Sequence, residues 1–101
     1  MKSDQVWVYV DIAPGISGRN DMHFTALPTG GGPATVQAMT VELSEPGQDL
    51  PPLTVPLQKL GEGHYYAPLF DIPYPGQWSM TVRVQLSATD EAVLVSSFRL
   101  R

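Results

Sequence analysis

The stretch from Pro75 to Leu86 constrains the fold more than any other part of the chain. Its apolar side chains recur at every second position, at Trp78, Met80, Val82, Val84 and Leu86, with polar side chains between them. A period of two is typical of a β-strand with one buried and one wet face, whereas a helix repeats its apolar residues at three and four. The pattern therefore predicts a central strand of an antiparallel sheet, with Trp78 as its largest core side chain.

Length and composition limit the chain to one domain, residues 1–101, with enough apolar residues for a core. Of its 101 residues 43% are hydrophobic and 16% are charged. The net charge of −4 argues against nucleic acid as a partner, and the absence of cysteine excludes disulfides, thiolate metal sites and cysteine nucleophiles. No apolar run approaches the ~20 residues that span a bilayer, so we expect no membrane insertion of this segment. Residues 1–4 lead directly into a strand-like segment without the apolar stretch of a secretion signal, so we expect either a cytoplasmic protein or a piece of a longer chain.

Six further segments have the composition and alternation of strands, and prolines and glycines separate them. They cover residues 5–12, 21–27, 35–44, 53–57, 64–67 and 91–101. Pro56 cannot donate a hydrogen bond, so we expect residues 53–57 to form an edge strand. Residues 69–74 are expected to form a bridge to the central strand. The glycine-rich segment 28–33 is predicted to be a hairpin loop, because the Lys-Ser/Thr of a phosphate-binding loop does not follow it. Seven short strands predict an all-β fold, a seven-stranded immunoglobulin-like antiparallel β-sandwich.

Residues that could carry chemistry are few. The aspartates lie mostly beside turns, and neither a nucleophile elbow nor a His-Glu-x-x-His pair is present, so we expect no enzyme activity. The candidate metal ligands are His23 and His64, because imidazole binds copper and the chain has no thiolate. Met22 is expected in the core, since neighbours on a strand point to opposite faces. For His64, a purely structural role beside Gly63 stays open.

Three motifs carry a resemblance to a known family. They are Pro14-Gly15-x-x-Gly18-x-Asn20, Gly61-x-Gly63-His64-Tyr65-Tyr66 and Pro75-Gly76-x-Trp78-x-Met80-x-Val82-x-Val84. Together they resemble the YtkA-like extracytoplasmic domain, in the version found at the C-terminus of CopC/CopD-type copper transport membrane proteins. The resemblance runs from about Val8 to the end of the chain.

The resemblance implies a β-sandwich outside the cytoplasmic membrane, excised from a longer membrane protein. Such a domain would serve copper transport or homeostasis by transient copper contact or by docking. Its partner would be the membrane portion of its parent chain or a copper-handling protein. The chain contains neither a membrane segment nor the family's separate N-terminal copper-binding module, so no family ligand can be assigned to its residues. The alternative is a structural or protein-binding sandwich with no metal role.

Overall fold

The computed structural model describes residues 1–29, 36–47 and 50–101, which form two antiparallel sheets. The strands are β1 (Val6–Ala13), β2 (Gly18–Pro28), β3 (Ala38–Ser44), β4 (Leu53–Val55), β5 (Gln58–Gly61), β6 (His64–Ile72), β7 (Gly76–Gln85) and β8 (Glu91–Leu100). Sheet A has the order β1-β2-β6-β5, and sheet B has the order β4-β3-β7-β8. Within the described ranges, no helix is long and apolar enough to cross a membrane.

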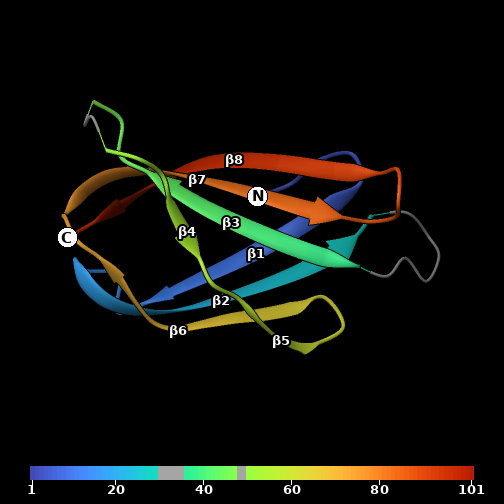
Figure 1. The fold of residues 1–101 in the computed structure, drawn as a ribbon, viewed down its shortest axis with the longest axis horizontal. Helices are drawn as coiled ribbons and strands as arrows, with labels where there is room; N and C mark the ends of the chain where they lie inside the picture. Colours follow the sequence, from blue (N-terminus) through green and yellow to red (C-terminus); the bar gives the residue numbers. More distant parts are fainter. Residues whose placement is uncertain (30–35, 48–49) are drawn as a thin grey trace.

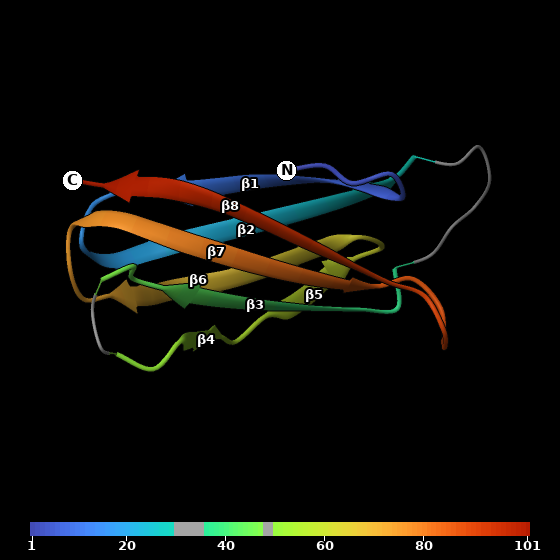
Figure 2. The same ribbon diagram turned by 90° about the horizontal axis from the view of Figure 1, so that it is seen from above.

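The two sheets pack face to face as a sandwich (Figures 1 and 2). Their strand orders are those of an immunoglobulin-type fold, in which strands A, B, E and D oppose C, F and G, with one added strand beside C. The predicted all-β, immunoglobulin-like antiparallel sandwich is therefore confirmed. The described residues contain eight strands, however, where the sequence predicted seven.

The core lies between the sheets and consists of the side chains on the inward face of each strand. β7 pairs with both β3 and β8, so it is the interior strand that its sequence predicted. Trp78 is 1% exposed, and its Nε1 donates a hydrogen bond of 2.9 Å to the carbonyl oxygen of Tyr74. The other apolar side chains of β7 are also buried: Met80, Val82 and Val84. In β1, Val6 and Val8 face the core.

The strand predicted over residues 53–57 corresponds to β4, an edge strand of sheet B that ends at Val55. The extra strand is β5, an edge strand of sheet A that begins at Gln58, after the predicted segment. Pro56 cannot contribute to a ladder, and the chain changes sheets at this point. The predicted edge position is confirmed, but the strand is shorter than predicted and β5 was missed.

The strand predicted at residues 64–67 is also longer in the structure, because β6 continues to Ile72. A register shift against β2 occurs between Asn20 and Met22, and Leu69 has a φ of 51° at this bulge. The N–H of Leu69 donates to Asp21 Oδ1 at 2.9 Å. The bulge interrupts the alternation of side chains, so the predicted bridge over residues 69–74 is mostly strand.

Candidate functional site

Two of the three sequence motifs hold turns in place. In the first, Asn20 is fully buried, and its Oδ1 accepts a hydrogen bond of 2.8 Å from the N–H of Gly15. Its Nδ2 donates to the carbonyl oxygens of Ile16 at 2.8 Å and Gly18 at 3.0 Å. In the second motif, Gly63 has a φ of 72°, and a Cβ there would lie 2.6 Å from the carbonyl oxygen of Ala26.

The third motif contains the core strand β7 and the bond from Trp78 to Tyr74 described above. Most motif residues thus serve the fold, because they close turns or fill the core. His64 is the exception, since it belongs to the second motif but has an exposed side chain. Chemistry must therefore come from His64 and from residues outside the motifs.

The two predicted metal ligands lie on the same outer face of sheet A. His23 of β2 is opposite Tyr66 of β6, and His64 of β6 is opposite Thr25 of β2. The two histidines are therefore diagonal neighbours on adjacent strands, a relation that places Cα atoms roughly 7–8 Å apart. Both are exposed. The structure thus brings together two residues that are 41 positions apart in the sequence (64 − 23).

Each imidazole has a defined contact on this face. The ring of His23 stacks on that of Tyr66, with 4.4 Å between centroids and 27° between planes. Nδ1 of His64 lies 3.3 Å from Oγ1 of Thr25. This contact leaves Nε2 of His64 without a hydrogen-bond partner among the described residues, and Nε2 is a nitrogen through which imidazole commonly binds metals.

The described residues do not complete a closed metal site around the two histidines. No group of three or more His, Asp or Glu side chains in these ranges lies close enough to hold a metal ion. Asp11 of β1 is opposite His23 in the sheet, but it does not form such a group. Three methionines lie in the core, Met22, Met39 and Met80, so their thioethers do not reach this face.

Two of the aspartates accept hydrogen bonds from nearby groups. Oδ1 of Asp21 accepts the bond from the N–H of Leu69 at the bulge, and Oδ2 of Asp90 accepts one of 3.3 Å from Oγ of Ser87 in the turn before β8. Asp11 and Asp71 lie within β1 and β6, away from the turns where aspartates were expected. Asp49 lies outside the described residues.

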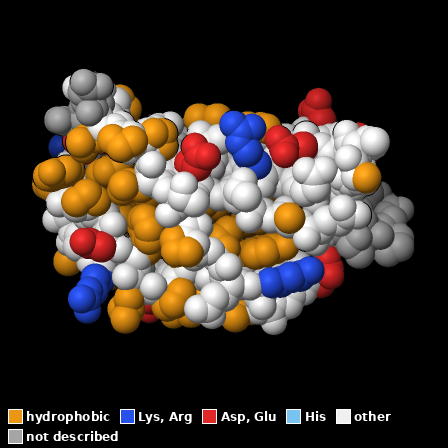
Figure 3. All heavy atoms as spheres, in the orientation of Figure 1, with side chains coloured by type: hydrophobic (Ala, Val, Ile, Leu, Met, Phe, Trp, Pro, Cys, Tyr) orange, Lys and Arg blue, Asp and Glu red, His pale blue; other side chains and the backbone are white. Residues whose placement is uncertain are grey.

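An exposed aromatic group lies next to the histidines. Trp7 and Tyr9 of β1 are 45% and 53% exposed, and their ring centroids are 6.4 Å apart. Tyr9 is opposite Thr25, and Trp7 is opposite Leu27, which is 50% exposed. The sequence signal for this group is the alternation in residues 5–12, in which Trp7 and Tyr9 occupy the side opposite to Val6 and Val8. The face of sheet B, which is turned to the viewer in Figure 3, shows no histidine.

These observations define a small antiparallel β-sandwich domain with two histidines and an aromatic group on one outer face. The chain belongs to the FixH family, which it matches over residues 7–97. The comparison does not confirm the more specific resemblance to the YtkA-like domain, which stays a prediction. No match was found among curated proteins.

Among solved structures, the chain is similar to a DUF4426 family protein from Pseudomonas aeruginosa PAO1. The TM-score is 0.71 and the sequence identity is 11%, and the match covers 99% of this chain and 94% of the other. At this identity the likeness supports the fold alone.

Proposed function

We propose that this domain is the extracytoplasmic accessory domain of a copper transport or homeostasis membrane protein. It contacts copper transiently through His23 and His64. The observation that carries the proposal is the position of both imidazoles, side by side on one exposed face. The resemblance of the three motifs to the YtkA-like domain supports copper as the metal and the outer side of the membrane as the location.

Two imidazoles suit transfer of an ion better than storage. Imidazole binds copper, but a ligand set of two leaves coordination positions open for a partner or for solvent. Because imidazole ligates only in its neutral form, binding weakens as the pH falls. A weak, open site allows an ion to pass to the membrane portion of the parent chain or to another copper-handling protein.

A second candidate function is docking of a protein partner without any metal. The exposed group of Trp7, Tyr9 and Leu27 favours it, because aromatic residues are enriched where proteins bind one another. Neither candidate function involves catalysis.

A copper titration followed by NMR distinguishes the two candidate functions. The chain has two histidines, so each imidazole signal can be assigned from the variants His23→Asn and His64→Asn. We expect both signals to respond to about one equivalent of Cu(II), or of Cu(I) under anaerobic reducing conditions, and each variant to bind more weakly. Gln85→Ala, on sheet B, is the matched control and should bind as the wild type does.

Other responses of the imidazole signals would change the proposal. If neither imidazole responds, the ligand role is lost and docking through the aromatic group remains. A response from one histidine alone indicates a site that a partner completes. The location is tested separately: a cysteine introduced at Thr40 in the membrane-bound parent protein should react with a membrane-impermeant maleimide from outside the cell.

A further inference from the structure

β8 is an edge strand without the usual protection against pairing. It runs for ten residues at the edge of sheet B and contains no proline. Residues 92–98 also carry no charge. Val93 and Val95 are 47% and 66% exposed on its outer side. Soluble proteins usually blunt such edges with charges, prolines, bulges or short strands, because a free edge is a template for another strand.

The backbone of β8 is free where these valines lie. At one end, the N–H of Leu86 donates to the carbonyl oxygen of Asp90, on the side of β7. At the other end, the N–H of Arg101 donates to the carbonyl oxygen of Gly15, on the side away from β7. Backbone groups alternate in direction along an antiparallel strand, and the β7–β8 register has no shift. The N–H and C=O groups of Val93, Val95 and Ser97 therefore face the open edge.

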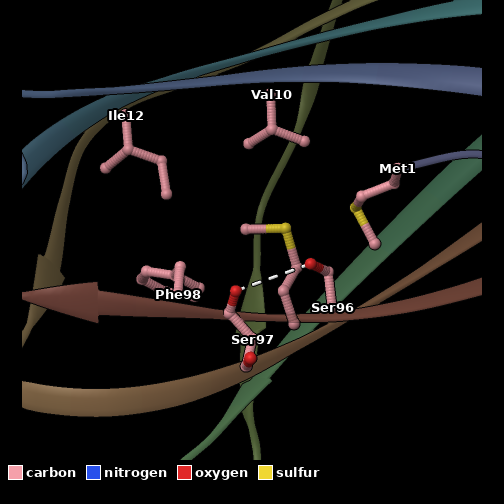
Figure 4. A pocket seen from close by; sticks show the side chains of 7 residues that line it. Met1, Val10, Ile12, Ser96, Ser97 and Phe98 are labelled. Carbon is pink, nitrogen blue, oxygen red and sulfur yellow. Dashed lines mark hydrogen bonds between the residues drawn. The ribbon is translucent and has the colours of Figure 1, made fainter.

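The inner side of the same strand borders a hollow. The inward residues of β8 are apolar except Ser96, which lies opposite Met80. The small side chain leaves a space of about 140 Å³ between the sheets. Figure 4 shows Val10 and Ile12 of β1 on one side of this space, and Ser96 and Phe98 of β8 on the other.

We propose that a second copy of this chain pairs along β8, antiparallel and with the two-fold axis at Val95. This register is self-complementary in size. Val95 lies opposite Val95 of the second copy, and Val93 lies opposite Ser97. Leu94 lies opposite Ser96, so the larger side chain of each copy is next to the hollow of the other. The two B sheets join into one continuous sheet with an isologous interface.

The same register is complementary in charge. It places Glu91 of each copy opposite Arg99 of the other, on the outer face of the joined sheet. Arg99 makes no ion pair with any described residue of its own chain, and Glu91 has one exposed partner, Arg83, at 3.5 Å. A shift of two residues in either direction puts Leu94 opposite Leu94 or Ser96 opposite Ser96, and the fit of large to small is lost.

Sedimentation velocity over a concentration series tests the pairing. We expect the wild type to show a monomer–dimer equilibrium. Val95→Lys brings two ammonium groups together at the two-fold axis and should weaken dimerisation about tenfold or more. Thr40→Lys adds the same charge to β3, in the interior of sheet B, and is the matched control that should leave the equilibrium unchanged. A wild type that stays monomeric at millimolar concentration overturns the proposal.

Charge reversal tests the register with two variants that check each other. Arg99→Glu alone places like charges opposite one another in its homodimer, and so does Glu91→Arg alone. Each variant should dimerise about tenfold more weakly than the wild type. In an equimolar mixture of the two, every opposed pair is again of opposite sign, so heterodimers should form. A mixture that stays as weak as its components overturns the register, whatever each substitution does to the fold.

Cross-linking gives a second measure of the register. Val95→Cys places two thiols on residues whose Cα atoms are about 5.5 Å apart in the proposed pair, within disulfide range, and the chain has no other cysteine. Val93→Cys places them roughly 13 Å apart along the strands. Mild oxidation should link the first variant and not the second. Equal linking of both, or linking of Val93→Cys alone, contradicts the two-fold axis at Val95.

Discussion

Replacing Asn20 with alanine should destabilise the domain by about 3 kcal/mol. The side chain is fully buried and makes three hydrogen bonds to the backbone of residues 15–18. Each such bond contributes about 1 kcal/mol net, and the loss also leaves backbone groups of a partly buried loop without partners. For a domain of this size, the change corresponds to a melting temperature lower by roughly 12–24 °C.

The effect should reach the end of β8, because the same loop is bonded to it. The N–H of Ser17 donates to the carbonyl oxygen of Arg101 at 3.0 Å, and Arg101 donates to Gly15. Hydrogen exchange of the Gly15, Ser17 and Arg101 amides should therefore accelerate together in Asn20→Ala. The free energy of unfolding is measured by urea denaturation.

The neighbouring residue provides the matched control. Asp21 makes one exposed hydrogen bond to the backbone, at Leu69, so Asp21→Ala should cost about 1 kcal/mol or less. If Asn20→Ala costs no more than Asp21→Ala, or leaves the exchange of Gly15 and Ser17 unchanged, Asn20 does not hold the loop.

Two further predictions concern the core. Trp78→Ala should lower the free energy of unfolding by roughly 3–5 kcal/mol, because it removes the largest fully buried side chain. Gln77→Ala, on the wet side of β7, should be nearly neutral. An unchanged melting temperature for Trp78→Ala would contradict its place in the core. Tyr65→Phe should be neutral or stabilising at pH 7, because the Tyr65 hydroxyl has no hydrogen-bond partner among the described residues. Burial, and to a lesser extent the charge of Glu62, raise the pKa of Tyr65, so the unfolded chain ionises first and stability falls as the pH rises above ~10. Urea denaturation at pH 8 and pH 11 should show a smaller loss in Tyr65→Phe than in the wild type, whereas Tyr9→Phe, at an exposed tyrosine, should behave as the wild type does.

The sequence predicted most of the fold where one side of a strand is buried and the other is wet. β7 and β3 follow this pattern without interruption, and Met22 of β2 is buried as predicted. Prediction failed at two places where the backbone departs from the pattern. Pro56 marks a change of sheet that resembles a simple edge strand in the sequence. The bulge at Leu69 hides the second half of β6, because a positive φ outside glycine leaves no clear sequence signal.

The sequence predicted which residues belong to the candidate site, but it did not predict that they lie close together. Residue type alone singled out His23 and His64, since the chain has no cysteine and no other imidazole. Their approach depends on the pairing of β2 with β6, a contact across 41 positions whose register is displaced by the bulge at Leu69. The self-complementary edge of β8 depends likewise on knowing which backbone groups face outward, which alternation within one strand does not give.

The motifs that resemble the YtkA-like domain and the residues that would give this chain a function are largely different sets. Asn20, Gly63 and Trp78 are required by the backbone, since each satisfies or permits a contact that any domain with these turns needs. Similarity at such residues indicates a shared fold, and it indicates a shared function only when the exposed residues are similar as well. In this chain the exposed features that could carry a function are the two imidazoles beside the aromatic group on sheet A, and the unprotected edge strand β8 on sheet B. The two sheets thus present separate surfaces, so copper contact and pairing along β8 can be tested, and can fail, independently.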